Sequence, residues 1–195
     1  MRQVEVCRKT KETDIVVKLN LDGKGQYANQ TGVGFLDHML DALAKQGRFD
    51  LEVSCKGDLQ VDAHHTVEDV GIVLGQALAK ALGEMRGIKR YGHMILPMDE
   101  ALVLTAIDIS GRSYLNYDVQ IPAAKVGDFD TELAKEFFYG LTRHAAITLH
   151  IKQLAGENSH HILECVFKSF GKALGMACSI DPELEGEIPS TKGVL

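Results

Sequence analysis

The sequence contains one motif twice, a pair of histidines followed three residues later by a glutamate. The first copy is His64-His65-Thr66-Val67-Glu68 and the second is His160-His161-Ile162-Leu163-Glu164. The chain has eight histidines, so half of them stand in these two copies. Imidazole nitrogens and carboxylate oxygens are common ligands of divalent cations. The repeated motif therefore predicts two metal sites.

Helix geometry decides which side chains of each motif can share an ion. Residues four apart lie on one helix face, so the first histidine and the glutamate of a copy can hold the same ion. The second histidine points about 100° away and can reach a different ion. Each site is therefore expected to take ligands from the other half of the chain or from another subunit. We expect two ligand sets: His38, His64, Glu68 and His161 for one ion, and Glu136, His160, Glu164 and His65 for the other.

The ligand types indicate which metal to expect. Imidazole and carboxylate without thiolate favour Mn, Fe, Co or Zn at a site that allows octahedral coordination. A structural zinc site would usually include cysteine, and neither copy of the motif contains a cysteine. The alternative is that histidines at a helix start only cap the helix or lie on a solvated surface. Two copies at matched positions favour metal. His93 and His144 have no counterpart in the repeat and are expected in surface or packing roles, while His150 stays open.

The similarity between the two halves extends beyond the histidines. At an offset of 96 residues, Gly75 matches Gly171 and Leu78 matches Leu174. Such self-similarity indicates an internal duplication. We therefore expect one domain, residues 1–195, built from two pseudo-repeats at about 1–90 and 91–182 and followed by a short tail.

Each half predicts the same series of elements. A β-rich run is followed by a turn that we interpret as a hairpin, then a helix, a strand and a long helix that begins at the His-His pair. The expected ranges are 14–21, 22–25, 35–45, 49–54 and 65–82 in the first half, and 101–109, 110–112, 132–145, 147–153 and 161–178 in the second. Strands in consecutive pairs favour an α+β fold, with two sheets on a helical layer, over a doubly wound parallel sheet.

The composition limits the class of protein. With 45% hydrophobic and 25% charged residues, the chain is typical of a soluble globular protein. A net charge of −6 disfavours nucleic acid as the main partner. No run reaches the roughly 18–20 apolar residues that span a bilayer, and the first residues lack the apolar core of a secretory signal. Four widely spaced cysteines without a CxxC pair indicate reduced thiols. We expect a cytoplasmic protein without a membrane partner.

Basic and hydroxyl residues form a second candidate group. Arg90, Arg112 and Lys168 stand at separate points of the chain, and the tail contains Ser190 and Lys192. Taken singly, each is more often a solvated side chain. Together they could bind a phosphate, which requires several donors at once.

Four segments resemble the imidazoleglycerol-phosphate dehydratase family: Gly32–Leu40, Asp62–Asp69, Asn158–His161 and Ser190–Leu195. The resemblance covers nearly the whole chain and is to the monofunctional form, without a phosphatase domain. It implies helices sandwiched between two four-stranded sheets. It also implies the dehydration of imidazoleglycerol phosphate to imidazoleacetol phosphate in histidine biosynthesis, with two Mn(II) ions per active site. A homo-oligomeric, 24-subunit shell with metals at subunit contacts is expected.

The resemblance also implies roles for individual residues. The metal ligands would be His38, His64, His65, Glu68, Glu136, His160, His161 and Glu164. The phosphate would be held by Arg90, Arg112, Lys168, Ser190 and Lys192. Glu12, together with Glu164, would move protons as general acid or base. Many members carry histidine where this chain has Glu136, and carboxylate can replace imidazole on Mn(II).

Two other functions fit the same residues. A di-metal hydrolase of a phosphorylated small molecule would also use a dinuclear site and basic side chains. A non-catalytic protein could use the histidine pairs only to cement an oligomer through metal. Catalytic sites keep an open coordination position, whereas structural sites close it.

Overall fold

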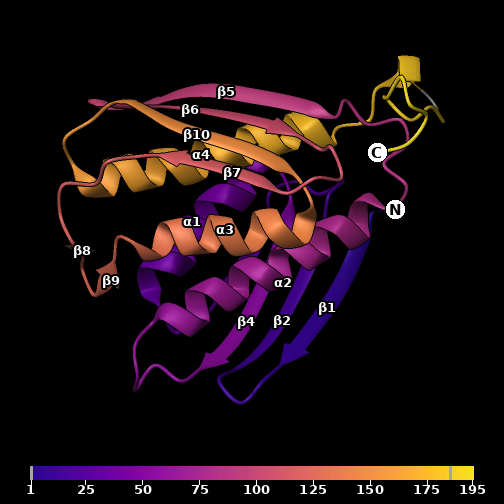
Figure 1. The fold of residues 1–195 in the computed structure, drawn as a ribbon. Coiled ribbons are helices and arrows are strands. Elements are labelled where there is room, and N and C mark those ends of the chain that lie inside the picture. Colours follow the sequence, from indigo (N-terminus) through magenta and orange to yellow (C-terminus); the bar gives the residue numbers. More distant parts are fainter. Residues whose placement is uncertain (1, 185) are drawn as a thin grey trace.

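Two four-stranded sheets enclose a layer of four helices in the computed structural model, which describes residues 2–184 and 186–195 (Figure 1). The first sheet has the order β1-β2-β4-β3 and the second β5-β6-β10-β7. The strands of the first sheet are β1 (Gln3–Lys9), β2 (Thr13–Asn20), β3 (Tyr27–Gln30) and β4 (Asp50–Gly57). Those of the second are β5 (Tyr91–Met98), β6 (Ala101–Asp108), β7 (Tyr114–Asp118) and β10 (Thr148–Ala155). The predicted α+β architecture is confirmed.

The remaining elements lie between and beside the sheets. The helices are α1 (Gly34–Gly47), α2 (His64–Leu82), α3 (Leu133–Ala145) and α4 (Ser159–Cys178), each within two residues of its predicted bounds. Two short strands, β8 (Lys125–Val126) and β9 (Phe129–Asp130), pair with each other before α3, and a 3-10 turn (Pro182–Leu184) follows α4. The two sheets share one strand order, but the duplication itself stays a prediction.

The two turns predicted as hairpins do not join neighbouring strands. After residues 22–25 the chain enters β3, which pairs in parallel with β4 rather than with β2. After residues 110–112 it enters β7, which likewise pairs in parallel with β10. Parallel neighbours require a crossover connection, and α1 and α3 provide it. The hairpins are instead β1–β2 and β5–β6. Strands do pair in consecutive order there, but each sheet is mixed, and the interpretation of residues 22–25 and 110–112 as hairpin turns was wrong.

Glycines allow the helices to pack closely in parallel pairs. On α4, Gly171 lies against the carbonyl of Leu43, and Gly175 lies against that of Gly47, both on α1. A Cβ at Gly171 would be 2.5 Å from the Leu43 carbonyl oxygen, closer than any van der Waals contact. Because both residue numbers increase together, α1 and α4 run in the same direction. The pair α2 and α3 packs in the same way.

The core lies between the helices and the inner faces of both sheets. Alternate residues of β2, including Ile15 and Val17, are fully buried, as period-two strands with one covered face require. Between α3 and α4, four phenylalanine rings stack with centroids 4.9–5.2 Å apart: Phe137, Phe138, Phe167 and Phe170. This continuous core fixes the helices against one another.

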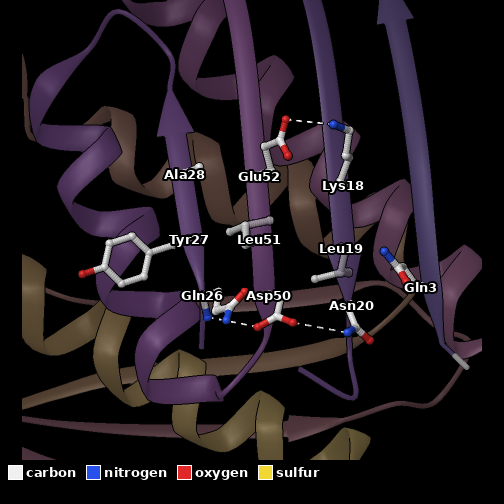
Figure 2. Close-up of a pocket in the computed structure, with 10 residues that line it drawn as sticks. All are labelled: Gln3, Lys18, Leu19, Asn20, Gln26, Tyr27, Ala28, Asp50, Leu51 and Glu52. Carbon is white, nitrogen blue, oxygen red and sulfur yellow. Dashed lines mark hydrogen bonds and ion pairs between the residues drawn. The ribbon is translucent and has the colours of Figure 1, made fainter. Parts of the chain in front are cut away.

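The outer face of the first sheet carries a shallow hollow (Figure 2). Lys18 pairs with Glu52 at 2.9 Å across β2 and β4, and Asp50 accepts hydrogen bonds from Asn20 and Gln26. None of the residues around this hollow is a predicted site residue. All four cysteines are free. Among the described residues, no helix is long and apolar enough to cross a membrane.

Replacing Gly171 with alanine tests the helix contact. The added methyl group would meet the Leu43 carbonyl at 2.5 Å, so we expect the free energy of unfolding to fall by about 1–3 kcal/mol, as for other overpacked cores. Urea denaturation at a fixed protein concentration would measure it. Gly34→Ala is the matched control, because nothing lies within 4 Å of its Cβ position. Equal stability of the two variants would contradict the proposed close contact.

Candidate metal centre

Each His-His pair stands in the first turn of a long helix, where a preceding side chain accepts backbone N–H groups of the pair. The Asn158 side chain accepts hydrogen bonds from the backbone N–H groups of His160 and His161. In the first half, the Asp62 carboxylate accepts the N–H of His64 at 2.7 Å. Such side-chain acceptors satisfy the free N–H groups at a helix start. These hydrogen bonds therefore fix where the imidazoles leave the backbone.

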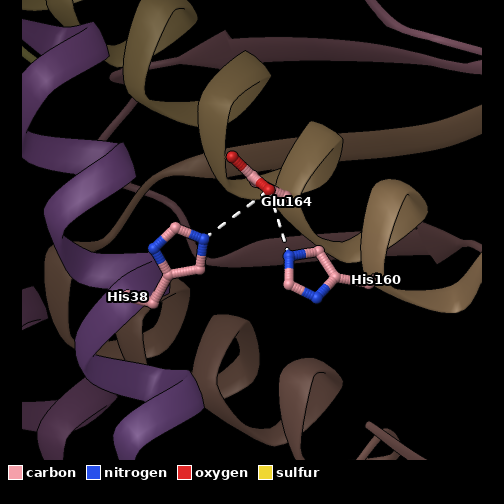
Figure 3. Close-up of side chains that lie close together, drawn as sticks. All are labelled: His38, His160 and Glu164. Atoms are coloured by element: carbon pink, nitrogen blue, oxygen red, sulfur yellow. Dashed lines mark hydrogen bonds and ion pairs between the residues drawn. The ribbon is translucent and has the colours of Figure 1, made fainter.

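Three ligand-type side chains meet where α1 passes the start of α4 (Figure 3). The Glu164 Oε2 atom lies 3.2 Å from His160 Nε2 and 3.6 Å from His38 Nε2. The three ligand atoms all lie within 4.8 Å of one another. With metal–ligand bonds of about 2.0–2.2 Å, donors on one ion are roughly 3–4 Å apart. The group can therefore close around a single divalent cation.

Glu164 is kept in its charged form. The side chain is buried, which by itself raises the pKa of the carboxyl group. The Lys168 ammonium, 2.7 Å from Oε1, and the nearby His38 and His160 outweigh burial and hold the pKa of Glu164 below its usual value. An ionised carboxylate is the form that binds a metal ion. Glu164 is thus suited to act as a ligand, and its expected role in proton transfer stays a prediction.

The structure groups His38 differently from the predicted ligand sets. His38 was expected beside His64 and Glu68, but within one chain it lies with His160 and Glu164. The reason is the helix pairing, because α1 packs along α4 and not along α2. The sequence could not show this pairing, since α1 comes just before α2 in the chain. The group thus joins a residue of the first half to two of the second.

In the first-half motif, His64 and Glu68 lie close to each other but are joined by no third ligand-type side chain in the described part of one chain. His64 Nε2 lies 3.7 Å from Glu68 Oε2, and both side chains are about two-fifths exposed. Glu136 is partly buried in the first turn of α3, the helix that packs along α2. In the described part of a single chain, Glu136 joins no group of three ligand-type side chains. Its role as a ligand stays a prediction.

The second histidine of each pair faces a carboxylate that the sequence did not indicate. His65 Nδ1 lies 3.0 Å from Asp58, and His161 Nδ1 lies 2.8 Å from Glu100. Glu12 lies near the other ring nitrogen of His65, with Oε1 3.8 Å from Nε2. Neither His65 nor His161 belongs to the group around Glu164. Asp58 and Glu100 stand on loops outside the repeated motif, so no spacing rule could find them.

The residues predicted to hold phosphate separate into two places. Four of them line one cavity beside the C-terminal tail: Arg90, Arg112, Ser190 and Lys192. The Arg90 guanidinium is paired with Asp108 at 2.7 Å and also donates to the Pro189 carbonyl. Lys168 is not in this cavity and pairs with Glu164 instead. Within one chain, Lys168 therefore cannot bind a phosphate held in the cavity beside the tail.

The three remaining histidines have other surroundings. His144 Nδ1 contacts the Gly140 carbonyl oxygen at 2.9 Å, within α3. His150 is exposed on β10 beside the ring of Tyr114, and His93 is exposed on β5. None of them belongs to a group of three ligand-type side chains in the described structure. For His93 and His144 this matches the expected surface or packing roles.

Comparisons with known proteins agree with this architecture. A sequence model of the imidazoleglycerol-phosphate dehydratase family matches residues 31–174. Over all 195 residues the chain is 59% identical to the imidazoleglycerol-phosphate dehydratase of Dinoroseobacter shibae, covering 100% of both chains. It is 58% identical to that of Lachnoclostridium phytofermentans, covering 100% of this chain and 98% of the relative.

Solved structures show the same similarity. The imidazoleglycerol-phosphate dehydratase of Staphylococcus aureus superposes with a TM-score of 0.84 at 37% identity, covering 92% of this chain and 99% of that one. A crystal structure of IGPD from Pyrococcus furiosus gives a TM-score of 0.84 at 44% identity, covering 97% and 100%.

Replacing His160 with alanine tests the three-ligand group. The variant loses one of three converging donors, and we expect its affinity for Mn(II) to fall by more than about 100-fold, because losing even an outer partner of a ligand costs 10- to 100-fold. Equilibrium dialysis with metal analysis would measure it. His150→Ala removes an imidazole outside the group and should bind Mn(II) normally. Unchanged binding by His160→Ala would exclude His160 from the ligands.

Proposed function

The chain belongs to the imidazoleglycerol-phosphate dehydratase family and is a hydro-lyase of histidine biosynthesis; on this premise we propose that it converts imidazoleglycerol phosphate to imidazoleacetol phosphate with two Mn(II) ions per active site. The observation that carries the proposal is the convergence of His38, His160 and Glu164. These are nitrogen and oxygen donors without sulfur, which suit Mn(II).

The group around Glu164 has room for a further ligand. His38 and His160 are each close to half exposed, and both line a cavity of about 760 Å³ with the loop at residues 59–63 and the short β8–β9 hairpin at residues 125–130. Three protein ligands leave coordination positions free on an octahedral ion, which is typical of catalytic metal sites. A substrate, or a ligand from a neighbouring chain, could occupy those positions.

The difficult step is the removal of a proton from a carbon beside an imidazole ring, with no carbonyl to absorb the charge. When bound, Mn(II) would supply Lewis-acid chemistry and keep the ring nitrogens deprotonated. Glu12 would take and return protons as the general base and acid. Its hairpin is held firmly, because the Thr10 hydroxyl accepts the N–H groups of Glu12 and Thr13.

The hairpin that carries Glu12 is also tied to helix α2. The Thr13 hydroxyl donates to the buried Asp69 carboxylate at 2.5 Å, and Arg8 pairs with the same oxygen at 2.6 Å. Asp69 directly follows Glu68 on α2. Glu12 is thereby fixed relative to the first His-His motif, and such fixed geometry is what makes a proton transfer efficient.

The substrate's phosphate would be held by Arg90, Arg112, Ser190 and Lys192 at the tail. Phosphate binding away from the reacting carbon positions the substrate and so contributes to the rate. In one chain this cavity shares no lining residue with the cavity at His38 and His160. A small substrate must contact both groups at once, which supports sites shared between subunits.

We further propose a homo-oligomer, with the 24-subunit shell as the expected form. His65, His161 and Lys168 would then reach metal or phosphate from a neighbouring chain, completing sites that one chain leaves partial. No nucleic acid or membrane partner is proposed. A cytoplasmic location fits a biosynthetic enzyme of this kind.

Product analysis tests the reaction. The Mn(II)-loaded protein should convert imidazoleglycerol phosphate to the ketone imidazoleacetol phosphate, measured by its absorbance after enolisation in alkali, with no release of inorganic phosphate. Phosphate release without ketone would identify a hydrolase instead. A metal-cemented, non-catalytic oligomer would give neither product and would not bind free imidazole at the metal.

Replacing Glu12 with glutamine separates catalysis from metal binding. We expect turnover to fall by about 100-fold or more, the usual contribution of a general acid or base, while Mn(II) content stays unchanged. Steady-state kinetics and metal analysis on the same preparation would measure both. Near-normal turnover would remove Glu12 from the mechanism.

A further inference from the structure

The two second histidines share one feature that the ligand motif does not require. Each places its Nδ1 atom against a carboxylate: His65 against both oxygens of Asp58, at 3.0 and 3.2 Å, and His161 against Glu100 at 2.8 Å. An ionised carboxylate can only accept a hydrogen bond, so Nδ1 must carry the proton. The free lone pair of the neutral ring is then on Nε2.

The two carboxylates do not occupy equivalent places in the halves. Glu100 lies on the β5–β6 hairpin, where the β1–β2 hairpin of the first half has Glu12. Asp58 follows β4, in the loop before α2. The first half thus uses a different carboxylate at Nδ1 of its histidine, while the hairpin glutamate, Glu12, lies nearer the other ring nitrogen, with Oε1 3.8 Å from Nε2.

We propose that Asp58 and Glu100 are positioning residues that hold His65 and His161 with Nδ1 protonated and so present Nε2 to the metal. The inference rests on the proposed metal function and deepens it. It also gives the two hairpin glutamates different roles. Glu100 binds Nδ1 of His161. In the first half Asp58 binds Nδ1 of His65, so Glu12 can act on the substrate.

The surroundings of Glu100 fit this assignment. Its second oxygen accepts the backbone N–H groups of Glu157 and Asn158, at 3.2 and 2.8 Å. The carboxylate is therefore fixed in orientation between the cap of α4 and the His161 ring. The hydrogen bond from His161, followed by that from Asn158, lowers the pKa of Glu100 to about 2, so it accepts at neutral pH.

Asp58 holds His65 through the same ring nitrogen, with both carboxylate oxygens within 3.2 Å of Nδ1. In the described structure the Asp58 carboxylate makes no hydrogen bond or ion pair with any other side chain, while the Asp58 backbone N–H donates to the Glu12 carbonyl at 3.0 Å. The loop of Asp58 and the hairpin of Glu12 are thus joined. Carboxylates that bind the outer nitrogen of a ligand histidine fix its tautomer and ring direction.

Glu100→Gln is the sharpest test. One amide oxygen can still accept the two backbone N–H groups, but the amide nitrogen then faces Nδ1 and, as a donor, favours the tautomer protonated on Nε2. We expect metal-free protein to bind Mn(II) 10- to 100-fold more weakly, about the cost of losing such a partner. Titration followed by electron paramagnetic resonance of free Mn(II) would measure it.

Glu157→Gln is the matched control. It removes the same charge from the neighbouring loop, and the exposed Glu157 side chain contacts neither imidazole among the described residues. It should bind Mn(II) normally. Asp58→Ala is an independent test if Glu100→Gln does not fold. We expect its Mn(II) affinity to fall by the same 10- to 100-fold. Thermal unfolding of the metal-free variants would verify the fold.

The outcomes distinguish this inference from the proposed function. Normal Mn(II) affinity in both Glu100→Gln and Asp58→Ala, with binding lost in His160→Ala, would overturn the positioning role alone. Normal affinity in His160→Ala as well would overturn the metal site itself. Equal losses in Glu157→Gln and Glu100→Gln would show a general charge effect and would also overturn the positioning role.

Discussion

The contact between α1 and α4 is the constraint on which the candidate site depends. Gly171 and Gly175 allow the α1 backbone to approach so closely that any side chain at Gly171 would meet the Leu43 carbonyl. The two helices run in parallel, and this direction brings the second turn of α1 to the start of α4. His38 therefore reaches Glu164 although more than 120 residues separate them in the chain. Without the glycines, the ligand group would open.

Burial and charge then prepare the group for a cation. Glu164 is taken out of water, which costs free energy for a carboxylate, and the Lys168 ammonium offsets that cost at 2.7 Å. The two histidines stay partly exposed and can give up solvent for a metal ion. His65 and His161, the second histidines of the two motifs, are instead held by Asp58 and Glu100 and do not belong to this group. A single chain thus supplies parts of several sites, which is the physical reason to propose assembly.

The two halves share a strand order but differ in the polar contacts between the hairpin and the long helix. Asp69 on α2 binds Thr13 and Arg8 and so fixes the hairpin of Glu12. At the corresponding position on α4, an offset of 96 residues, the chain has Cys165, whose thiol donates to the Leu96 carbonyl. A duplicated frame can keep its packing while the polar links diverge. In the second half, the hairpin glutamate Glu100 is bound by His161 and two backbone N–H groups, whereas Glu12 is the glutamate that we propose to react.

The sequence by itself determined the helices, the α+β class and the side chains that could bind metal, because the hydrophobic period and the repeated motif are local properties. It did not determine that β3 and β7 lie in parallel beside β4 and β10, since a turn between strands looks the same whether or not they pair. Nor did it show that His38 joins His160, or that Asp58 and Glu100 hold the outer histidines. Those contacts depend on which helix packs on which, and only the tertiary structure decides this, through backbone approach at glycines that carry no chemistry of their own.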